Sequence, residues 1–102
     1  MRLIGFQQKV YNLLIKIPRG KITTYKILAR AAGRPKNWRQ IGKILSQNKN
    51  KCTFPCYKVV KSNGEIGGYN CGKLVKKKLL QKEGIRVFNN KIRDFKKVIF
   101  RF

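Results

Sequence analysis

The sequence predicts a small α/β domain: a winged-helix-like helix-turn-helix, then a short cysteine-bearing extended segment and a C-terminal β-hairpin extension. Two stretches with helical periodicity lie on either side of a turn at Gly33 and Pro35, which is the pattern of a helix-turn-helix. After residue 48 the chain changes to short apolar segments and glycine-rich loops. Its 102 residues, 42% of them hydrophobic, suffice for one domain with a modest core.

The first half of the chain is predicted to be helical. Apolar residues recur at helical spacing over residues 6–16, which predicts an amphipathic helix that ends at Pro18. Thr24 is a candidate N-cap for a second helix over residues 25–32. A third helix, over residues 37–47, has its arginine, glutamine and lysine side chains facing outward. The pattern favours a helix-turn-helix, although many small helical bundles share it.

The second half is predicted to be mixed. Residues 54–61 form an apolar segment that we expect to be extended, and the glycine-rich loop around Tyr69 is either a plain connection or a close approach to a flat ligand. Leucines spaced by lysines predict a helix over residues 73–82. Residues 85–102 alternate in character at both ends, with an apolar face of their own, which predicts a β-hairpin. The long stretch of residues 91–97 leaves the register of the two strands open.

Positive charge dominates the composition. Lysine and arginine number 26 against 3 acidic residues, for a formal net charge of +23. This charge favours nucleic acid or another polyanion as the partner, and small ribosomal proteins share the same composition. Three cysteines and no histidine argue against a tetrahedral zinc site and fit a reducing compartment. Without a membrane-spanning run or a signal peptide, a cytoplasmic, nucleoid-associated protein is expected.

Cys56 is the candidate nucleophile. It follows Pro55 and opens an apolar run, in a chain whose positive charge favours the thiolate form of a cysteine. A free cysteine is also commonly a small buried core residue. The motif by itself leaves these two interpretations about equally favoured.

Several motifs together resemble the C-terminal domain of the O6-alkylguanine-DNA alkyltransferases, which repair DNA by accepting an alkyl group. Each motif alone is weak, but their order and spacing across residues 5–84 are specific. The matching motifs are Ile17-Pro18-Arg19-Gly20, Thr24-Tyr25-Lys26-Ile27-Leu28-Ala29, Arg39-Gln40-Ile41-Gly42, Asn48, Pro55-Cys56-Tyr57-Lys58-Val59-Val60, Gly64, Gly67-Gly68-Tyr69, Gly72, Leu79-Leu80 and Glu83-Gly84.

The resemblance implies a suicide repair reaction on double-stranded DNA that contains O6-alkylguanine. The family flips the damaged guanine out of the duplex, because its O6 substituent is out of reach of a protein nucleophile inside the stack. Cys56 would then attack the alkyl carbon and keep the group as a permanent thioether. The resemblance also implies a monomer that needs no cofactor and no metal.

The resemblance also implies which residues meet DNA. Arg39 would enter the base stack as a finger, with a phosphate contact as its ordinary alternative. Gln40 and Lys43 would lie on the same DNA-binding helix, which engages the minor groove. Tyr25 would sit beside the target phosphate and base, or else be a core tyrosine, and Thr24 would lie next to it on the DNA side.

The base pocket implied by the resemblance is lined largely by backbone. The carbonyl groups of Cys56 and Val59 would accept hydrogen bonds from the guanine amine. Tyr69 would form a wall of the pocket, and the N–H group of Asn70 would approach O6. Asn48 would brace the turn that leads to the cysteine, or serve as a simple helix cap.

This chain departs from the family pattern next to the cysteine. The family usually has a histidine there, which relays a proton through water with the residue equivalent to Glu83 behind it, whereas this chain has Tyr57. A phenol is a poor base at neutral pH, although nearby cations favour the ionised forms of Tyr57 and Cys56. Lys58 replaces an arginine, and Cys71 replaces a glycine, which implies a stiffer loop and a smaller pocket.

The resemblance starts a few residues after Met1 and leaves room for no N-terminal domain of the family type. We therefore expect residues 1–84 to form the DNA-binding and active-site domain, with residues 85–102 as a hairpin extension that covers apolar surface or tracks DNA. The small size also resembles alkyltransferase-like proteins, which bind lesions without transferring the alkyl group. Those proteins replace the cysteine, so Cys56 favours transfer over that alternative.

Overall fold

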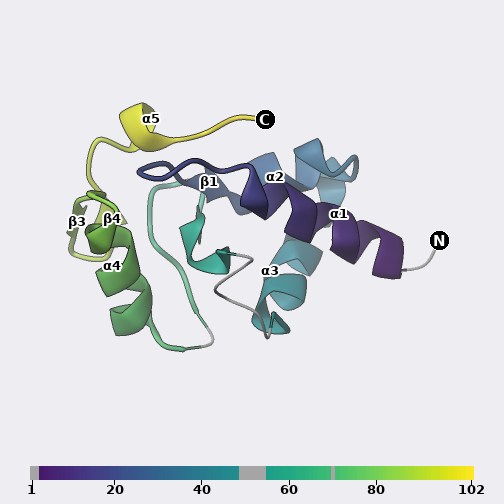
Figure 1. The fold of residues 1–102 in the computed structure, drawn as a ribbon, viewed down its shortest axis with the longest axis horizontal. Coiled ribbons are helices and arrows are strands. Elements are labelled where there is room, and N and C mark those ends of the chain that lie inside the picture. Colours follow the sequence, from purple (N-terminus) through teal and green to yellow (C-terminus); the bar gives the residue numbers. More distant parts are fainter. Residues whose placement is uncertain (1–2, 49–54, 70) are drawn as a thin grey trace.

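The computed structural model describes residues 3–48, 55–69 and 71–102. Helices α1 to α3 gather at one end of the molecule, and α4, a β-hairpin and α5 lie at the other, with a short parallel strand pair between them (Figure 1). The helices are α1 (Leu3–Ile15), α2 (Tyr25–Ala31), α3 (Trp38–Ser46), α4 (Lys73–Lys82) and α5 (Phe95–Val98). The strands are β1 (Thr23–Thr24), β2 (Val59–Val60), β3 (Val87–Phe88) and β4 (Lys91–Ile92).

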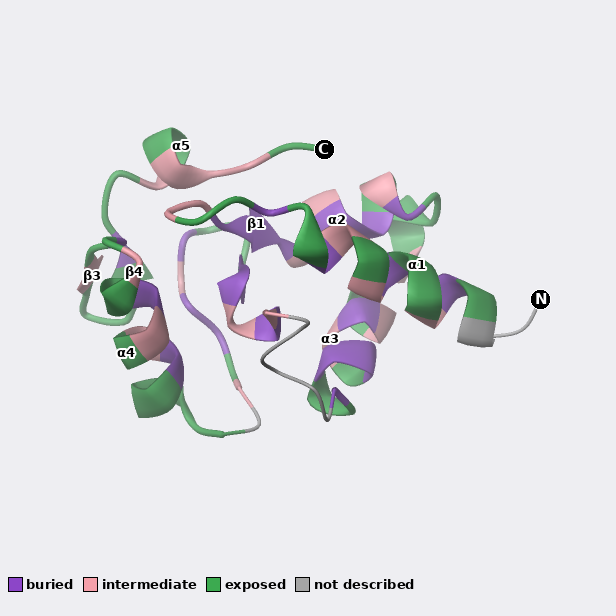
Figure 2. Ribbon diagram, viewed as in Figure 1, coloured by how far each residue is buried: buried purple, intermediate pink, exposed green. Residues whose placement is uncertain are grey.

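The helix-turn-helix is formed by α2 and α3, as predicted. The Thr24 hydroxyl accepts a hydrogen bond of 3.1 Å from the N–H group of Ile27 and so caps α2. Gly33 turns the chain with a positive φ of 86°, which glycine adopts without strain, and a 3₁₀ turn at Pro35–Asn37 leads into α3. The inner faces of both helices pack on α1, whose buried side follows the predicted periodicity (Figure 2).

The cysteine segment differs from the prediction. Residues 54–61 were expected to be extended, but Cys56–Lys58 is a 3₁₀ turn and only Val59–Val60 is a strand. Pro55 precedes the turn. The N–H group of Val59 donates a hydrogen bond to the carbonyl of Cys56, and this bond closes the turn. β2 then pairs in parallel with β1, with Thr23 opposite Val59. The first strand of the fold and the cysteine turn are therefore tied directly together.

The C-terminal hairpin is present, but its strands span only residues 87–92 and not the whole of residues 85–102, because Phe95–Val98 forms the helix α5. Asn89 and Asn90 have positive φ angles of 50° and 60°, which close a tight two-residue turn between β3 and β4. The end of the chain does not pair with β3. Ile99 instead forms a parallel bridge with Ile22, supported by a 2.8 Å hydrogen bond from the Ile22 N–H to the carbonyl of Val98.

Two apolar clusters hold the molecule together. One joins α1, α2 and α3 to Cys56 and Val59, and the other joins Val60 to α4, the hairpin and Ile22. The neighbouring residues Val59 and Val60 thus face different clusters, as alternation along a strand requires. In the described part of the chain, no helix is both long and apolar enough to span a bilayer.

Candidate active site and nucleic-acid interface

Cys56 lies at the bottom of a cavity between the helix-turn-helix and the glycine-rich loop. Its side chain is buried, with 3% of the residue exposed, and the cavity has a volume of about 350 Å³. The lining comes from α2, from one side of α3 and from the loop before α4: Tyr25, Gly42, Leu45, Ser46, Cys56, Gly68 and Tyr69. Cys71 is exposed and is not among these lining residues, so the expectation that it narrows the pocket is not supported.

Two tyrosines form walls of this cavity, and both respond to the cysteine. Burial raises the pKa of Tyr25, and the Cys56 sulfur raises it further. Burial is also the largest cause that raises the pKa of Tyr69. The charges of Cys56 and Cys71 and a hydrogen bond with Cys56 raise it further. Both phenols therefore keep their protons at neutral pH and can donate hydrogen bonds into the cavity.

Lys76 is fully buried behind the cavity, and the sequence analysis did not identify it. Its Nζ donates hydrogen bonds to the carbonyl oxygens of Val59, at 2.7 Å, and Gly68, at 3.1 Å. The ammonium also lies 6.0 Å from the centre of the Tyr25 ring. Burial lowers the pKa of Lys76 to about 8, while the negative charge of a Cys56 thiolate acts in the opposite direction. At neutral pH there is thus a buried cation close to Cys56.

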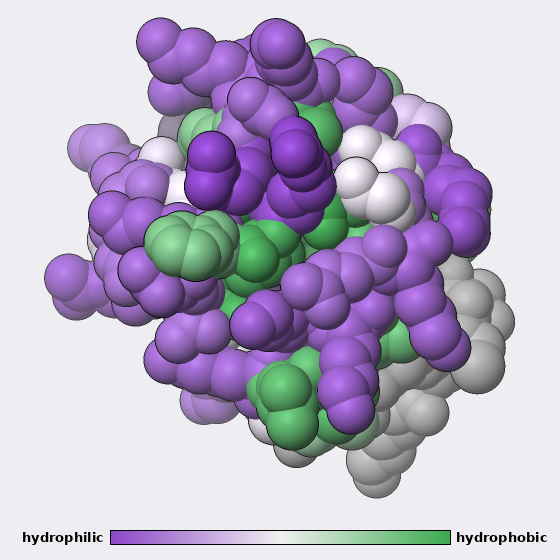
Figure 3. Space-filling model, turned by 90° about the vertical axis from the view of Figure 1, so that its left-hand side faces the viewer, coloured by the Kyte–Doolittle hydropathy of each residue, from purple (hydrophilic) through white to green (hydrophobic). Residues whose placement is uncertain are grey.

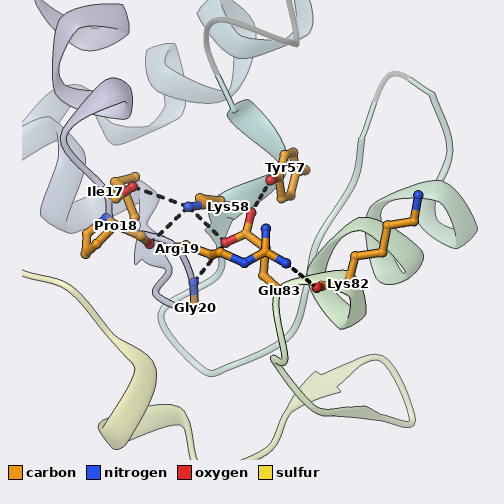
Figure 4. A network of polar contacts seen from close by, with 8 residues as sticks. All are labelled: Ile17, Pro18, Arg19, Gly20, Tyr57, Lys58, Lys82 and Glu83. Carbon is orange, nitrogen blue, oxygen red and sulfur yellow. Dashed lines mark hydrogen bonds and ion pairs between the residues drawn. The ribbon is translucent and has the colours of Figure 1, made fainter.

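Tyr57 belongs to a different network, which includes Glu83 and Lys58 (Figure 4). Its hydroxyl donates a hydrogen bond to Oε2 of Glu83, and Oε1 of Glu83 forms an ion pair of 2.9 Å with Nζ of Lys58. Both charged side chains are only 6% exposed. Gly20, at a positive φ of 82°, directs its N–H group at Glu83 Oε1 over 3.0 Å.

This network holds Tyr57 in its protonated form. Burial, the hydrogen bond to Glu83 and the charge of Glu83 raise the pKa of Tyr57, whereas the sequence predicted that nearby cations favour its ionised form. Burial alone would raise the pKa of Glu83, but hydrogen bonds from Tyr57, Gly20 and Lys58 lower it. Tyr57 is therefore a hydrogen-bond donor here and cannot act as a base near neutral pH.

Lys58 also connects the cysteine turn to the end of α1. Its Nζ donates to the carbonyl oxygens of Pro18, at 3.0 Å, and Ile17, at 3.3 Å. Nearby, Arg19 donates from Nη2 to the carbonyl of Lys82 at 2.8 Å (Figure 4). The loop after α1, the cysteine turn and the end of α4 are thus fastened to one another through Lys58 and Glu83.

The outer face of α3 carries the predicted DNA-binding residues. Arg39 and Lys43 are exposed, and Gln40 is half-buried. The side-chain oxygen of Gln40 accepts a hydrogen bond of 2.9 Å from the side-chain amide of Asn37. The Arg39 guanidinium lies 5.2 Å from the ring centre of Trp38, whose side chain is also partly exposed. Positive and aromatic groups therefore share one end of this helix.

The surroundings of Thr24 differ from those expected, and the roles predicted for Val59 and Asn48 stay predictions. Thr24 is 2% exposed and its hydroxyl caps α2, so its side chain does not face solvent for a DNA contact. The Val59 carbonyl already accepts from Lys76, and Asn48 is buried directly after α3. Asn70 lies outside the described residues.

A signal for Lys76 was present in the sequence. It lies four residues before Leu80 and therefore shares the buried face of α4. The opposite face of α4 and the hairpin beside it form a mainly hydrophilic surface with separate apolar patches (Figure 3). Leu74 and Phe88 are exposed among the apolar residues of these elements.

Comparisons with known proteins agree with the predicted resemblance. The family model of the 6-O-methylguanine DNA methyltransferase DNA-binding domain matches residues 5–85. A bifunctional methyltransferase/endonuclease of Picrophilus torridus is 41% identical over 100 residues, which are 98% of this chain and 33% of that protein. A methylated-DNA–protein-cysteine methyltransferase of Methanothermobacter thermautotrophicus is 40% identical over 81 residues, 78% of this chain and 44% of that protein. The chain thus spans less than half the length of these relatives.

Solved structures confirm the fold class. Atl1 of S. pombe, in complex with damaged DNA containing O6-carboxymethylguanine, matches with a TM-score of 0.90 and 27% identity over 100% of both chains. The O6-methylguanine-DNA methyltransferase of Pyrococcus kodakaraensis matches with a TM-score of 0.71 and 37% identity, over 78% of this chain and 46% of that one.

Proposed function

The chain belongs to the 6-O-methylguanine DNA methyltransferase family, and on that premise we propose that it repairs double-stranded DNA by taking the alkyl group of O6-alkylguanine onto Cys56. The observation that carries the proposal is the position of Cys56 in a cavity walled by Tyr25 and Tyr69, beside the DNA-binding helix α3. A free cysteine that served only as core packing would have no reason to line a cavity that opens beside that helix.

DNA reaches this cavity through its charge and through α3. Phosphate neutralisation by lysine and arginine provides most of the affinity, so binding weakens steeply as salt rises. Arg39 projects from the exposed side of α3 and enters the stack in place of the guanine that has flipped out. Gln40 and Lys43 contact the groove and backbone around it.

The transfer itself is a single displacement. The Cys56 sulfur forms a bond to the alkyl carbon while the bond from that carbon to O6 breaks, and the electron pair leaves with the guanine, which takes up a proton. Tyr25 and Tyr69 keep their hydroxyl protons and stabilise the charge that develops on the leaving guanine. The thioether is permanent, so one protein molecule repairs one lesion.

Lys76 supports the attacking sulfur in this account. Its buried ammonium favours the charge of the thiolate, which is the reactive form. Because Lys76 also bonds to the Val59 and Gly68 carbonyls, it holds both sides of the cavity at fixed positions. The histidine relay of the family is replaced here by an electrostatic arrangement, and Tyr57 and Glu83 serve as structural partners of Lys58.

Lesion recognition without transfer is the second candidate function. The likeness to S. pombe Atl1 over the full length of both chains favours it. Under this alternative the same cavity and the same α3 hold the damaged base, and Cys56 remains unmodified.

Intact mass measurement after incubation with a duplex that contains O6-methylguanine separates the two functions. We expect the wild type to gain one methyl group, located on Cys56 by peptide mapping. Cys56→Ser should gain none and still bind the lesion, and Cys71→Ser, at an exposed position, is the matched control that should react like the wild type. Tight lesion-selective binding by an unmodified wild type would contradict transfer and favour recognition alone.

A further inference from the structure

A second hollow adjoins the Cys56 cavity at the start of α3. Its volume is about 570 Å³, against about 350 Å³ for the Cys56 cavity. This size lies within the range of ~300–1,000 Å³ that is usual for small-molecule sites. Tyr25 and Gly42 line both hollows, so the two are adjacent at these residues. Tyr25 and Arg39 have roles in the proposed repair, but no role has been given to the space that the larger hollow encloses.

Trp38 is the distinctive residue of this larger hollow. It is the only tryptophan in the chain and is 37% exposed, and it is not part of either apolar cluster. Lys26 Nζ lies 5.6 Å from the centre of its ring, and the guanidinium carbon of Arg39 lies 5.2 Å away. A partly exposed aromatic ring with two cations close to it is accessible to a ligand, unlike the rings enclosed in the core.

The lining of the hollow defines the chemistry of that ligand. The Trp38 ring offers a flat apolar face, on which a flat heterocycle stacks. Lys26 and Lys61, which also line the hollow, offer positive charge for an anion beside the heterocycle. A nucleotide has both parts, a planar base and a phosphate. The position of the hollow on the DNA-binding side of α3 brings nucleotides to it.

We propose that Trp38 is a stacking platform for the base directly next to the flipped guanine on the same strand. The proposal rests on the proposed function, because it assumes that the guanine occupies the Cys56 cavity. The shared walls at Tyr25 and Gly42 leave a short path between the two hollows. Consecutive nucleotides of one strand suit that path better than bases on opposite strands. Lys26 and Lys61 then neutralise the phosphate groups that join or follow the two nucleotides.

The test measures equilibrium binding in the Cys56→Ser background, in which no transfer occurs. Three proteins are compared: this background alone, and with Trp38→Ala or Trp38→Phe added. Four duplexes carry O6-methylguanine: one intact, one with an abasic site on its 5′ side, one with an abasic site on its 3′ side, and one with an abasic site opposite. The fluorescence of Trp38 is recorded during each titration, and it reports stacking directly because the chain has no other tryptophan.

We expect Trp38→Ala to weaken binding to the intact duplex about tenfold and Trp38→Phe, which keeps an aromatic face, about threefold. On one of the two duplexes with an abasic neighbour, this difference should vanish, and the quenching of Trp38 fluorescence should vanish with it. A difference that persists on both of these duplexes, or one that vanishes only with the opposite base removed, overturns the proposal. So does an intact-duplex affinity that is the same for all three proteins.

The outcome is distinguishable from failure of the proposed function. Methyl gain is measured separately, by intact mass on the wild type with Cys56 present. A wild type that gains no methyl group while binding depends on Trp38 and its neighbouring base leaves the stacking platform in place and contradicts transfer. A wild type that gains a methyl group while Trp38 has no effect on binding contradicts the platform alone.

Discussion

Lys58 and Lys76 are both buried lysines next to the cysteine turn, yet their surroundings are opposite in character. Lys58 forms an ion pair with Glu83 and donates hydrogen bonds to carbonyls of the loop after α1. Lys76 bonds only to two backbone carbonyls, and none of the ion pairs in the described part of the chain includes it. The chain has 3 acidic residues, and the one that lies in the site is held by Lys58.

The difference separates a structural role from a chemical one. A buried ammonium whose charge is matched by a carboxylate stabilises the fold when both partners remain. A buried ammonium without a carboxylate has lost its hydration and has no counter-ion in return, which disfavours the charged form. Burial therefore lowers the pKa of Lys76. The anion that can compensate it is a Cys56 thiolate. We infer that Lys58 holds the site together and that Lys76 supports the nucleophile.

Removal of Lys58 should have the largest effect on stability. Lys58→Met leaves the Glu83 carboxylate buried without its counter-ion, which lowers the free energy of unfolding by about 3–5 kcal/mol. Urea denaturation checks this, with the exposed Lys16→Met as the control that should change stability by less than about 0.5 kcal/mol. Transfer by the folded fraction should remain within about threefold of the wild type. A stable Lys58→Met protein that transfers a hundredfold more slowly would reverse the assignment.

Removal of Lys76 should act mainly on transfer. Lys76→Met keeps the volume and removes the charge behind Cys56, so the single-turnover rate should fall about a hundredfold, as for other preorganised electrostatic groups. The substitution loses two hydrogen bonds, which destabilises the fold, and removes a desolvated charge, which stabilises it. Because the two effects oppose each other, the free energy of unfolding should change by less than about 2 kcal/mol. Lys78→Met, at an exposed position on the same helix, is the control. An unchanged rate in Lys76→Met would break the comparison between the two lysines.

Changes at Tyr57 should have the smallest effect. Tyr57→His restores the residue type usual in the family, but Tyr57 belongs to the Glu83 network, so we expect a transfer rate within about threefold of the wild type. Tyr57→Phe should lower the free energy of unfolding by about 1 kcal/mol through the lost hydrogen bond. Stopped single-turnover reactions measure the first effect and denaturation the second. A gain of tenfold or more in Tyr57→His would mean that proton removal limits the reaction in the wild type.

Local patterns were sufficient for helices α1 to α4, whereas α5 lies in a stretch predicted as part of the hairpin. Residues 73–82 were predicted as a helix and form α4 with the same bounds, because their leucine spacing matches the helical period. The turn at Gly33 and the cap at Thr24 also depend only on neighbouring residues. The fold class and the position of Cys56 near α3 followed from motif order, and solved structures confirm the fold.

Long-range contacts were not predictable in the same way. The hairpin register depended on Asn89 and Asn90 closing a tight turn, whereas the apolar run at the end of the chain alternates equally well as a strand. The pairing of Lys58 with Glu83 joins residues far apart in the sequence. Lys76 was missed because lysine is rarely buried, so its place on the leucine face of α4 was outweighed by residue type.

The role of Lys76 in transfer can be measured through the pH profile of the wild-type reaction. The pKa of Lys76 is lowered to about 8, so its ammonium is present below that pH and is lost as pH rises through it. If this cation supports transfer, the single-turnover rate should fall as pH rises above about 8, and Lys76→Met should lack this fall. If a thiol must instead lose its proton unaided, the rate should climb steadily as pH rises towards the ordinary cysteine value. A steady climb to pH 9 would contradict the account of Lys76.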